Sequence, residues 1–78
     1  MSLVLEKIQR IISELTDLDI STLSPEKFFI KDLDLDSLDI VEIVMGVEDE
    51  FNLHEKLEEL TFVNGTIAGL VLATEQAL

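Results

Sequence analysis

A chain of 78 residues has room for one domain, and a hydrophobic content of 47% predicts that this domain folds around a core. The sequence has no cysteine and one histidine, which excludes disulfides and thiol chemistry and disfavours zinc. The net charge of −12, from 17 acidic and 5 basic residues, disfavours nucleic acid and anionic membranes as partners and favours basic ones. The lack of cysteine fits a reducing cytoplasm, where we expect the protein to lie. No apolar run approaches the roughly 18 residues of a membrane span, so membrane insertion is not expected.

The first predicted element is an amphipathic helix over residues 3–15. Its apolar residues recur at helical spacing with charged residues between them (Val4, Ile8, Ile11, Ile12 and Leu15). Residues 16–36 have no long period and predict a loop of roughly 20 residues, a length that is often functional in compact domains. Within it, Ser-Pro-Glu at residues 24–26 predicts one helical turn, and Phe-Phe-Ile at residues 28–30 is expected to fix the loop to the core.

The strongest helical signal covers residues 37–51, where the apolar residues form two stripes. One stripe has the width of a core face (Ile40, Ile43, Val44, Val47 and Phe51). The other, formed by Leu38, Val41 and Met45, centres about 130° away, and a domain this thin can hardly bury both. Acids flank the second stripe, so we predict an exposed docking surface (the acids are Asp39, Glu42, Glu48 and Asp49). The alternative is that Leu38 packs under the loop and Met45 fills a gap.

The remaining residues predict two further helices. Residues 54–60 suit a short helix with Leu57 and Leu60 facing inward. Thr61 or Thr66 then caps a last helix, whose inward face is expected to be Ile67, Leu70, Val71, Thr74 and Leu78. No segment alternates as a strand does. The sequence therefore predicts an all-α fold: a small four-helix bundle, with three main helices plus one short helix and a long loop between the first and second helices.

Ser37 is the candidate residue for covalent chemistry because it opens the helix that carries two stripes. A phosphoryl group on its hydroxyl would meet free backbone N–H groups and the positive end of the helix dipole. Serine at such a position is more commonly a plain N-cap, and either Asp36 or Ser37 can cap this helix.

The run KDLDLDSLDIVEIVMGVEDEF (residues 31–51) resembles the phosphopantetheine attachment region of acyl carrier proteins, with Asp36-Ser37-Leu38 as its central motif. The resemblance implies that Ser37 receives 4′-phosphopantetheine from coenzyme A and that the thiol of this covalent arm carries acyl groups as thioesters. It implies a carrier for fatty acid or related lipid or polyketide biosynthesis rather than an enzyme. It also implies a set of partner-docking residues: Asp36, Leu38, Asp39, Val41, Glu42, Met45, Glu48 and Asp49.

The implied partners are a phosphopantetheinyl transferase and acyl-processing enzymes with basic docking patches, and the implied cargo is an acyl chain. We expect one monomeric acyl-carrier domain over residues 1–78. Three departures from the family pattern stand out: Asp34 replaces a common Gly, Gly46 replaces a usual Ala, and the segment after Phe51 is short and lacks Ile-Pro. An acyl pocket would be lined by Ile43, Val47, Leu60 and Ile67.

Other functions remain open at this point. The alternating aspartates of residues 32–36 imitate the start of an EF-hand loop, but Ser37 and Ile43 occupy positions that need Gly and Glu, so no metal site is predicted. A small enzyme with paired carboxylates would need a His, Cys or Lys placed to complete its site, and none is. The main alternative is an acidic helical protein-interaction module in which Ser37 is only a helix cap. A carrier for a specialised or peptidyl pathway is a close neighbour of the favoured function.

Overall fold

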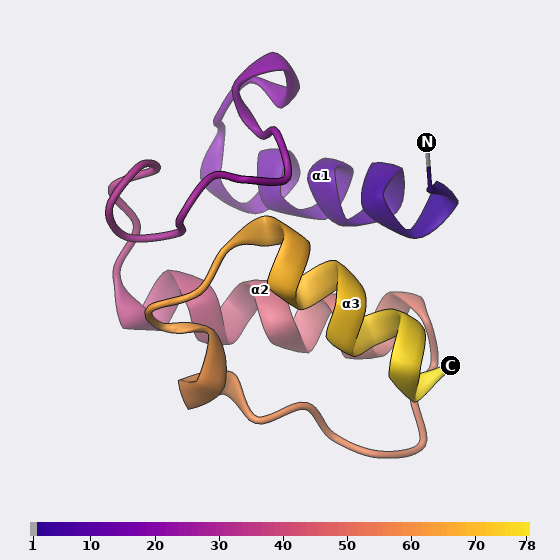
Figure 1. Cartoon of the computed structure of the whole chain (residues 1–78). Helices are drawn as coiled ribbons and strands as arrows, with labels where there is room; N and C mark the ends of the chain where they lie inside the picture. The colour runs from indigo at the N-terminus through magenta and orange to yellow at the C-terminus, as the bar shows by residue number, and fades with distance from the viewer. Residues whose placement is uncertain (1) are drawn as a thin grey trace.

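The computed structural model describes residues 2–78, which form three α-helices and two short 3₁₀ helices without a strand. These elements are α1 (Leu3–Thr16), η1 (Ile20–Thr22), α2 (Ser37–Glu50), η2 (Glu59–Phe62) and α3 (Ile67–Ala77). Helix α1 packs against both α2 and α3, and η2 packs against α2 (Figure 1). The predicted all-α fold with three main helices and a long first loop is confirmed. No helix of the described chain is long and apolar enough to cross a lipid bilayer.

The core joins one face of each helix to apolar residues of the loop. The side chains with at most 1% exposure include Ile8 and Ile12 of α1, Ile40, Ile43, Val44 and Val47 of α2, Ile67 and Leu70 of α3, and Leu23 and Phe29 of the loop. The predicted core stripe of α2 is therefore confirmed, and Phe51 packs half-buried at its end. Residues 28–30 were expected to fix the loop to the core. Of these, Phe29 is buried, whereas Phe28 and Ile30 are exposed at the edge of the core.

Both ends of α2 have side-chain or main-chain caps, which explains why its boundaries match the sequence pattern. Asp36 caps the beginning, and Asn52, with φ of 51°, turns the chain away at the end. The N–H groups of Asn52 and Leu53 donate to the carbonyls of Asp49 and Glu48 at 3.3 and 3.1 Å. This is the Schellman arrangement, in which a left-handed residue closes a helix.

The long loop is tied to α1 by side chains and contains more structure than the sequence predicts. Gln9 Nε2 donates to the carbonyl of Leu23 at 2.8 Å. The predicted turn at residues 24–26 is a single hydrogen-bonded turn, while the helix η1 four residues earlier was not predicted. Asp19 caps η1, because its carboxylate accepts a hydrogen bond from the Ser21 backbone N–H. This hydrogen bond holds the pKa of the Asp19 carboxyl below its ordinary value.

Main-chain carbonyls of the loop complete the N-terminus of α3. The N–H groups of Ile67 and Ala68 donate to the carbonyls of Lys27 and Pro25, at 3.0 and 2.8 Å. Thr66 Oγ1 accepts from the Gly69 N–H at 3.1 Å, so Thr66 rather than Thr61 is the N-cap. Three of the N–H groups that a helix leaves unpaired are satisfied here, and the loop and α3 are joined as one unit.

Replacing Thr66 by Ala is expected to lower the free energy of unfolding by about 1 kcal/mol, because the N–H of Gly69 loses its acceptor. In a domain of this size such a loss lowers Tm by roughly 4–8 °C, which thermal unfolding followed by circular dichroism will measure. Thr66→Ser retains the oxygen and should keep most of the stability. Equal Tm values for Thr66→Ala and the parent would show that the cap contributes nothing.

The segment between α2 and α3 differs most from the prediction. Residues 53–58 are not helical, and the short helix covers Glu59–Phe62 instead of residues 54–60. A run of seven residues is too short to hold a helix without tertiary contacts. Leu57 packs against the core as predicted, but Leu60 is 79% exposed because Phe62 occupies the inward position of η2. The prediction of Leu60 as an inward residue is therefore wrong. It is also wrong for Leu78, which lies exposed beyond the end of α3.

Candidate functional site

Ser37 is the first residue of α2, and its side chain is exposed. Asp36 and Asp39 form the cap: the Asp39 N–H donates to Asp36 Oδ1 at 2.9 Å, and the Asp36 N–H donates to Asp39 Oδ2 at 3.1 Å. This reciprocal pair is a capping box. The Ser37 hydroxyl has no hydrogen bond to any described residue. The interpretation of Ser37 as the helix cap is therefore wrong, because Asp36 provides the cap.

The loop before α2 holds this helix start in place. Leu33 and Leu35 are buried on either side of Asp34, which takes a left-handed conformation with φ of 57°. Glycine adopts such a conformation without steric cost, and Asp is among the few other residues that tolerate it. The backbone therefore accounts for Gly as the common residue at this position of the family. Asp32 also has a local role, because its Oδ2 accepts from the Phe28 N–H at 2.8 Å.

The start of α2 fits an attached phosphoryl group. The backbone N–H groups of Ser37 and Leu38 have no acceptor within residues 2–78, and they lie at the positive end of a helix of 14 residues. The neighbouring carboxylates of Asp36 and Asp39 are each bound to a main-chain N–H. The free hydroxyl, the two unpaired donors and the exposed position together suit a phosphodiester on Ser37.

The second apolar stripe of α2 is exposed. Leu38 and Met45 are 68% and 56% exposed, and Val41 between them is half-buried. The alternative, in which Leu38 packs under the loop and Met45 fills a gap, is wrong. The stripe begins beside Ser37 and continues along α2, so a protein that reaches Ser37 meets it.

The five predicted docking acids differ in what their carboxylates bind. Those of Asp36 and Asp39 belong to the capping box, and Glu48 Oε2 accepts from the Leu57 N–H at 2.6 Å. Glu42 and Asp49 make neither a hydrogen bond nor an ion pair with another described side chain or main-chain group. The internal role of Glu48 was missed because its partner is nine residues away and outside any helix.

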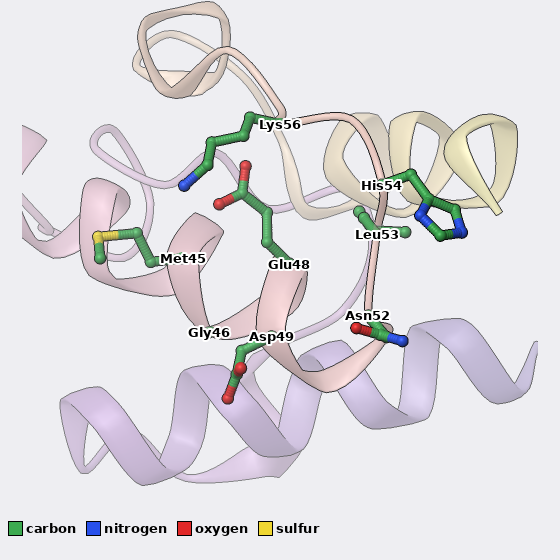
Figure 2. A pocket seen from close by; sticks show the side chains of 8 residues that line it. All are labelled: Met45, Gly46, Glu48, Asp49, Asn52, Leu53, His54 and Lys56. Atoms are coloured by element: carbon green, nitrogen blue, oxygen red, sulfur yellow. The ribbon is translucent and has the colours of Figure 1, made fainter.

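The predicted lining of the acyl pocket is closed in this structure. Ile43, Val47 and Ile67 are fully buried in the core, whereas Leu60 faces solvent and does not join them. The hollows lie at the surface. One of about 540 Å³ is bordered by Met45, Glu48, Asp49, Leu53 and Lys56, at the side of α2 that faces residues 53–56 (Figure 2).

Comparison with known proteins agrees with this geometry. Residues 6–73 match the family described as "Phosphopantetheine attachment site". The chain is 43% identical to "Acyl carrier protein 3" of Ralstonia nicotianae over 75 residues, covering 96% of this chain and 85% of that protein. It is 35% identical to "Acyl carrier protein" of Clostridium acetobutylicum over 77 residues, covering 95% and 100%. A match to "Acyl carrier protein" of Picosynechococcus sp. is 50% identical over 50 residues and spans 64% of this chain and 62% of that protein.

The chain therefore belongs to the acyl carrier protein family. The matched domain carries a covalently attached 4′-phosphopantetheine group. Proteins of this kind are carriers, not catalysts, and the chain is not an enzyme.

Proposed function

We propose that the chain is a single acyl-carrier domain over residues 1–78 that bears its 4′-phosphopantetheine arm on Ser37. The observation that carries this proposal is the free Ser37 hydroxyl, exposed on the first turn of α2 while Asp36 provides the cap. In attachment this hydroxyl is the nucleophile: its oxygen bonds to the phosphorus of coenzyme A that bears the pantetheine arm, and the pyrophosphate bond of coenzyme A breaks. Adenosine 3′,5′-bisphosphate leaves, and the hydroxyl proton is released as the phosphodiester forms. The attached arm supplies a terminal thiol that holds acyl groups as thioesters. The chain's own part is to present the hydroxyl and to offer two main-chain donors to the phosphoryl oxygens.

The proposed docking surface consists of the exposed stripe and the acids around it. Its members are Asp36, Leu38, Asp39, Val41, Glu42, Met45, Glu48 and Asp49. We propose that a phosphopantetheinyl transferase and acyl-processing enzymes bind here through basic patches. Residues 32–55 contain nine of the 17 acids and no Lys or Arg, which supports steering of cationic partners. A small surface with charge attraction also suits enzymes that must bind and leave in turn.

The wider setting follows from this carrier role. We propose that the cargo is an acyl intermediate of fatty acid synthesis or of a related lipid or polyketide pathway. We still predict that the protein acts as a monomer in the cytoplasm and that it binds neither nucleic acid nor membranes.

The test is to locate the modification. The protein is incubated with coenzyme A and a broad-specificity phosphopantetheinyl transferase, then digested, and the peptides are sequenced by tandem mass spectrometry. The chain has serines at 2, 13, 21, 24 and 37, so the digest discriminates between them. One phosphopantetheine on the peptide that contains Ser37 is expected. A folded protein that gains no mass would instead favour an acidic interaction module without an arm.

A further inference from the structure

One side chain of α2 makes a hydrogen bond to the chain between α2 and η2. Among residues 54–57, the Leu57 N–H is the main-chain group that has a hydrogen-bond partner within residues 2–78, and that partner is Glu48 Oε2 at 2.6 Å. An N–H bound to a carboxylate at this length is a strong, charge-assisted hydrogen bond. We call residues 53–58 the strap. Figure 2 shows the Glu48 side chain rising from α2 toward the strap near Lys56, while Asp49 points away from it.

The two ends of the strap are fixed in different ways. At its beginning, the Leu53 N–H belongs to the Schellman closure of α2 and donates to the Glu48 carbonyl at 3.1 Å. At its end, Leu57 places a half-buried side chain against the core. Residues 54–56 between these points are exposed. The long loop gives two main-chain hydrogen bonds to α3, whereas between Leu53 and Glu58 the strap has one hydrogen bond within the described chain, which acts together with the packing of Leu57.

Glu48 also borders the proposed docking surface. It lies one helical turn after Met45 of the exposed stripe, and Met45, Glu48 and Asp49 all border the same hollow. A basic partner on this face therefore meets the carboxylate that holds the strap. An arginine guanidinium binds both oxygens of a carboxylate, so it competes with the Leu57 N–H for Oε2.

We propose that Glu48 is a latch that couples docking to the strap. A cationic partner protein that binds at α2 forms an ion pair with the Glu48 carboxylate, and the hydrogen bond from the Leu57 N–H to Glu48 Oε2 breaks. The inference rests on the proposed function, since it assumes docking on this face. Because the coupling is a binding free energy it works in both directions. A chain whose strap is already released binds the basic partner more tightly, since the partner no longer has to break the bond.

The first arm of the test measures amide hydrogen exchange of Leu57 by NMR. Glu48→Gln should accelerate exchange of this amide by about fivefold to tenfold, because a neutral acceptor replaces a charged one. The matched control Glu55→Gln removes the same charge from an exposed strap residue and should leave the Leu57 rate unchanged. Equal Leu57 rates in Glu48→Gln and the parent would overturn the latch.

The second arm tests the coupling by measuring how tightly a phosphopantetheinyl transferase binds the chain. Coenzyme A is left out, so that binding is measured without attachment of the arm. Leu57→Pro removes the N–H and leaves Glu48 unbound, and it should bind the transferase several-fold more tightly than the control His54→Pro, whose lost N–H has no partner in the described structure. Should Leu57→Pro fail to fold, the parent decides: transferase binding should accelerate Leu57 exchange, and slower exchange overturns the coupling. Coenzyme A is then added to a separate portion of each sample, and mass gain at Ser37 there shows whether the carrier function itself stands.

Discussion

Ser37→Ala is expected to abolish attachment of the arm while leaving the fold unchanged. The variant lacks the one oxygen that α2 presents freely at its first residue, so incubation with coenzyme A and a transferase should give no mass gain. The hydroxyl makes no hydrogen bond with the rest of the described chain, and the residue is exposed. Substitution of such a surface residue changes the free energy of unfolding by at most about 0.5 kcal/mol, and Ala is favoured within helices. Intact mass and thermal unfolding measure the two expectations on one sample.

Two further variants separate the chemistry of Ser37 from its structural setting. Ser21→Ala, at an exposed position of η1, should be modified as completely as the parent. Asp36→Ala should lower stability by about 1 kcal/mol through loss of the cap, although it keeps the Ser37 hydroxyl. A full mass gain in Ser37→Ala would move the attachment to another serine. A large loss of stability in that variant would instead assign Ser37 a structural role.

The helices could be predicted from the sequence because their signals are local. The first helix was predicted at residues 3–15 and lies at Leu3–Thr16, and the second was predicted at residues 37–51 and lies at Ser37–Glu50. Helical periodicity marks the body of each one, while caps such as Asp36 and turns such as Asn52 mark its ends. The separation of two stripes on α2 depended on the same geometry, which is why the exposure of Leu38 and Met45 was also predicted.

The region after α2 could not be predicted because its contacts are not local. Whether Leu57, Leu60 or Phe62 turns inward depends on where α2 and the core receive the returning chain. The Glu48–Leu57 bond spans nine residues without helical or strand periodicity, so no sequence pattern marks it. For the same reason the sequence groups the acids of the docking surface as equals, whereas the fold uses the carboxylates of Asp36, Asp39 and Glu48 internally.

Charge reversal at the two acids without an internal partner is expected to have the largest effect on docking. Glu42→Lys and Asp49→Lys should each slow arm attachment by about tenfold at low salt and subsaturating transferase, because a repelling charge replaces an attracting one at the interface. Neither carboxylate contributes a bond to the described fold, so Tm should stay within a few degrees of the parent. The rate of mass gain gives the effect on docking, and thermal unfolding gives the effect on stability.

A salt series and a remote variant decide whether this effect is electrostatic and local. Raising the ionic strength from about 0.01 M to 1 M shortens the screening length from roughly 30 Å to 3 Å, so the difference between Glu42→Lys and the parent should shrink. Glu14→Lys, on an exposed position of α1, makes the same change of net charge and should slow attachment much less. If Glu14→Lys slows it as much as Asp49→Lys does, the partner senses only the total charge of the domain. If only Glu42→Lys and Asp49→Lys slow it, the free carboxylates beside the exposed stripe determine where the partner binds.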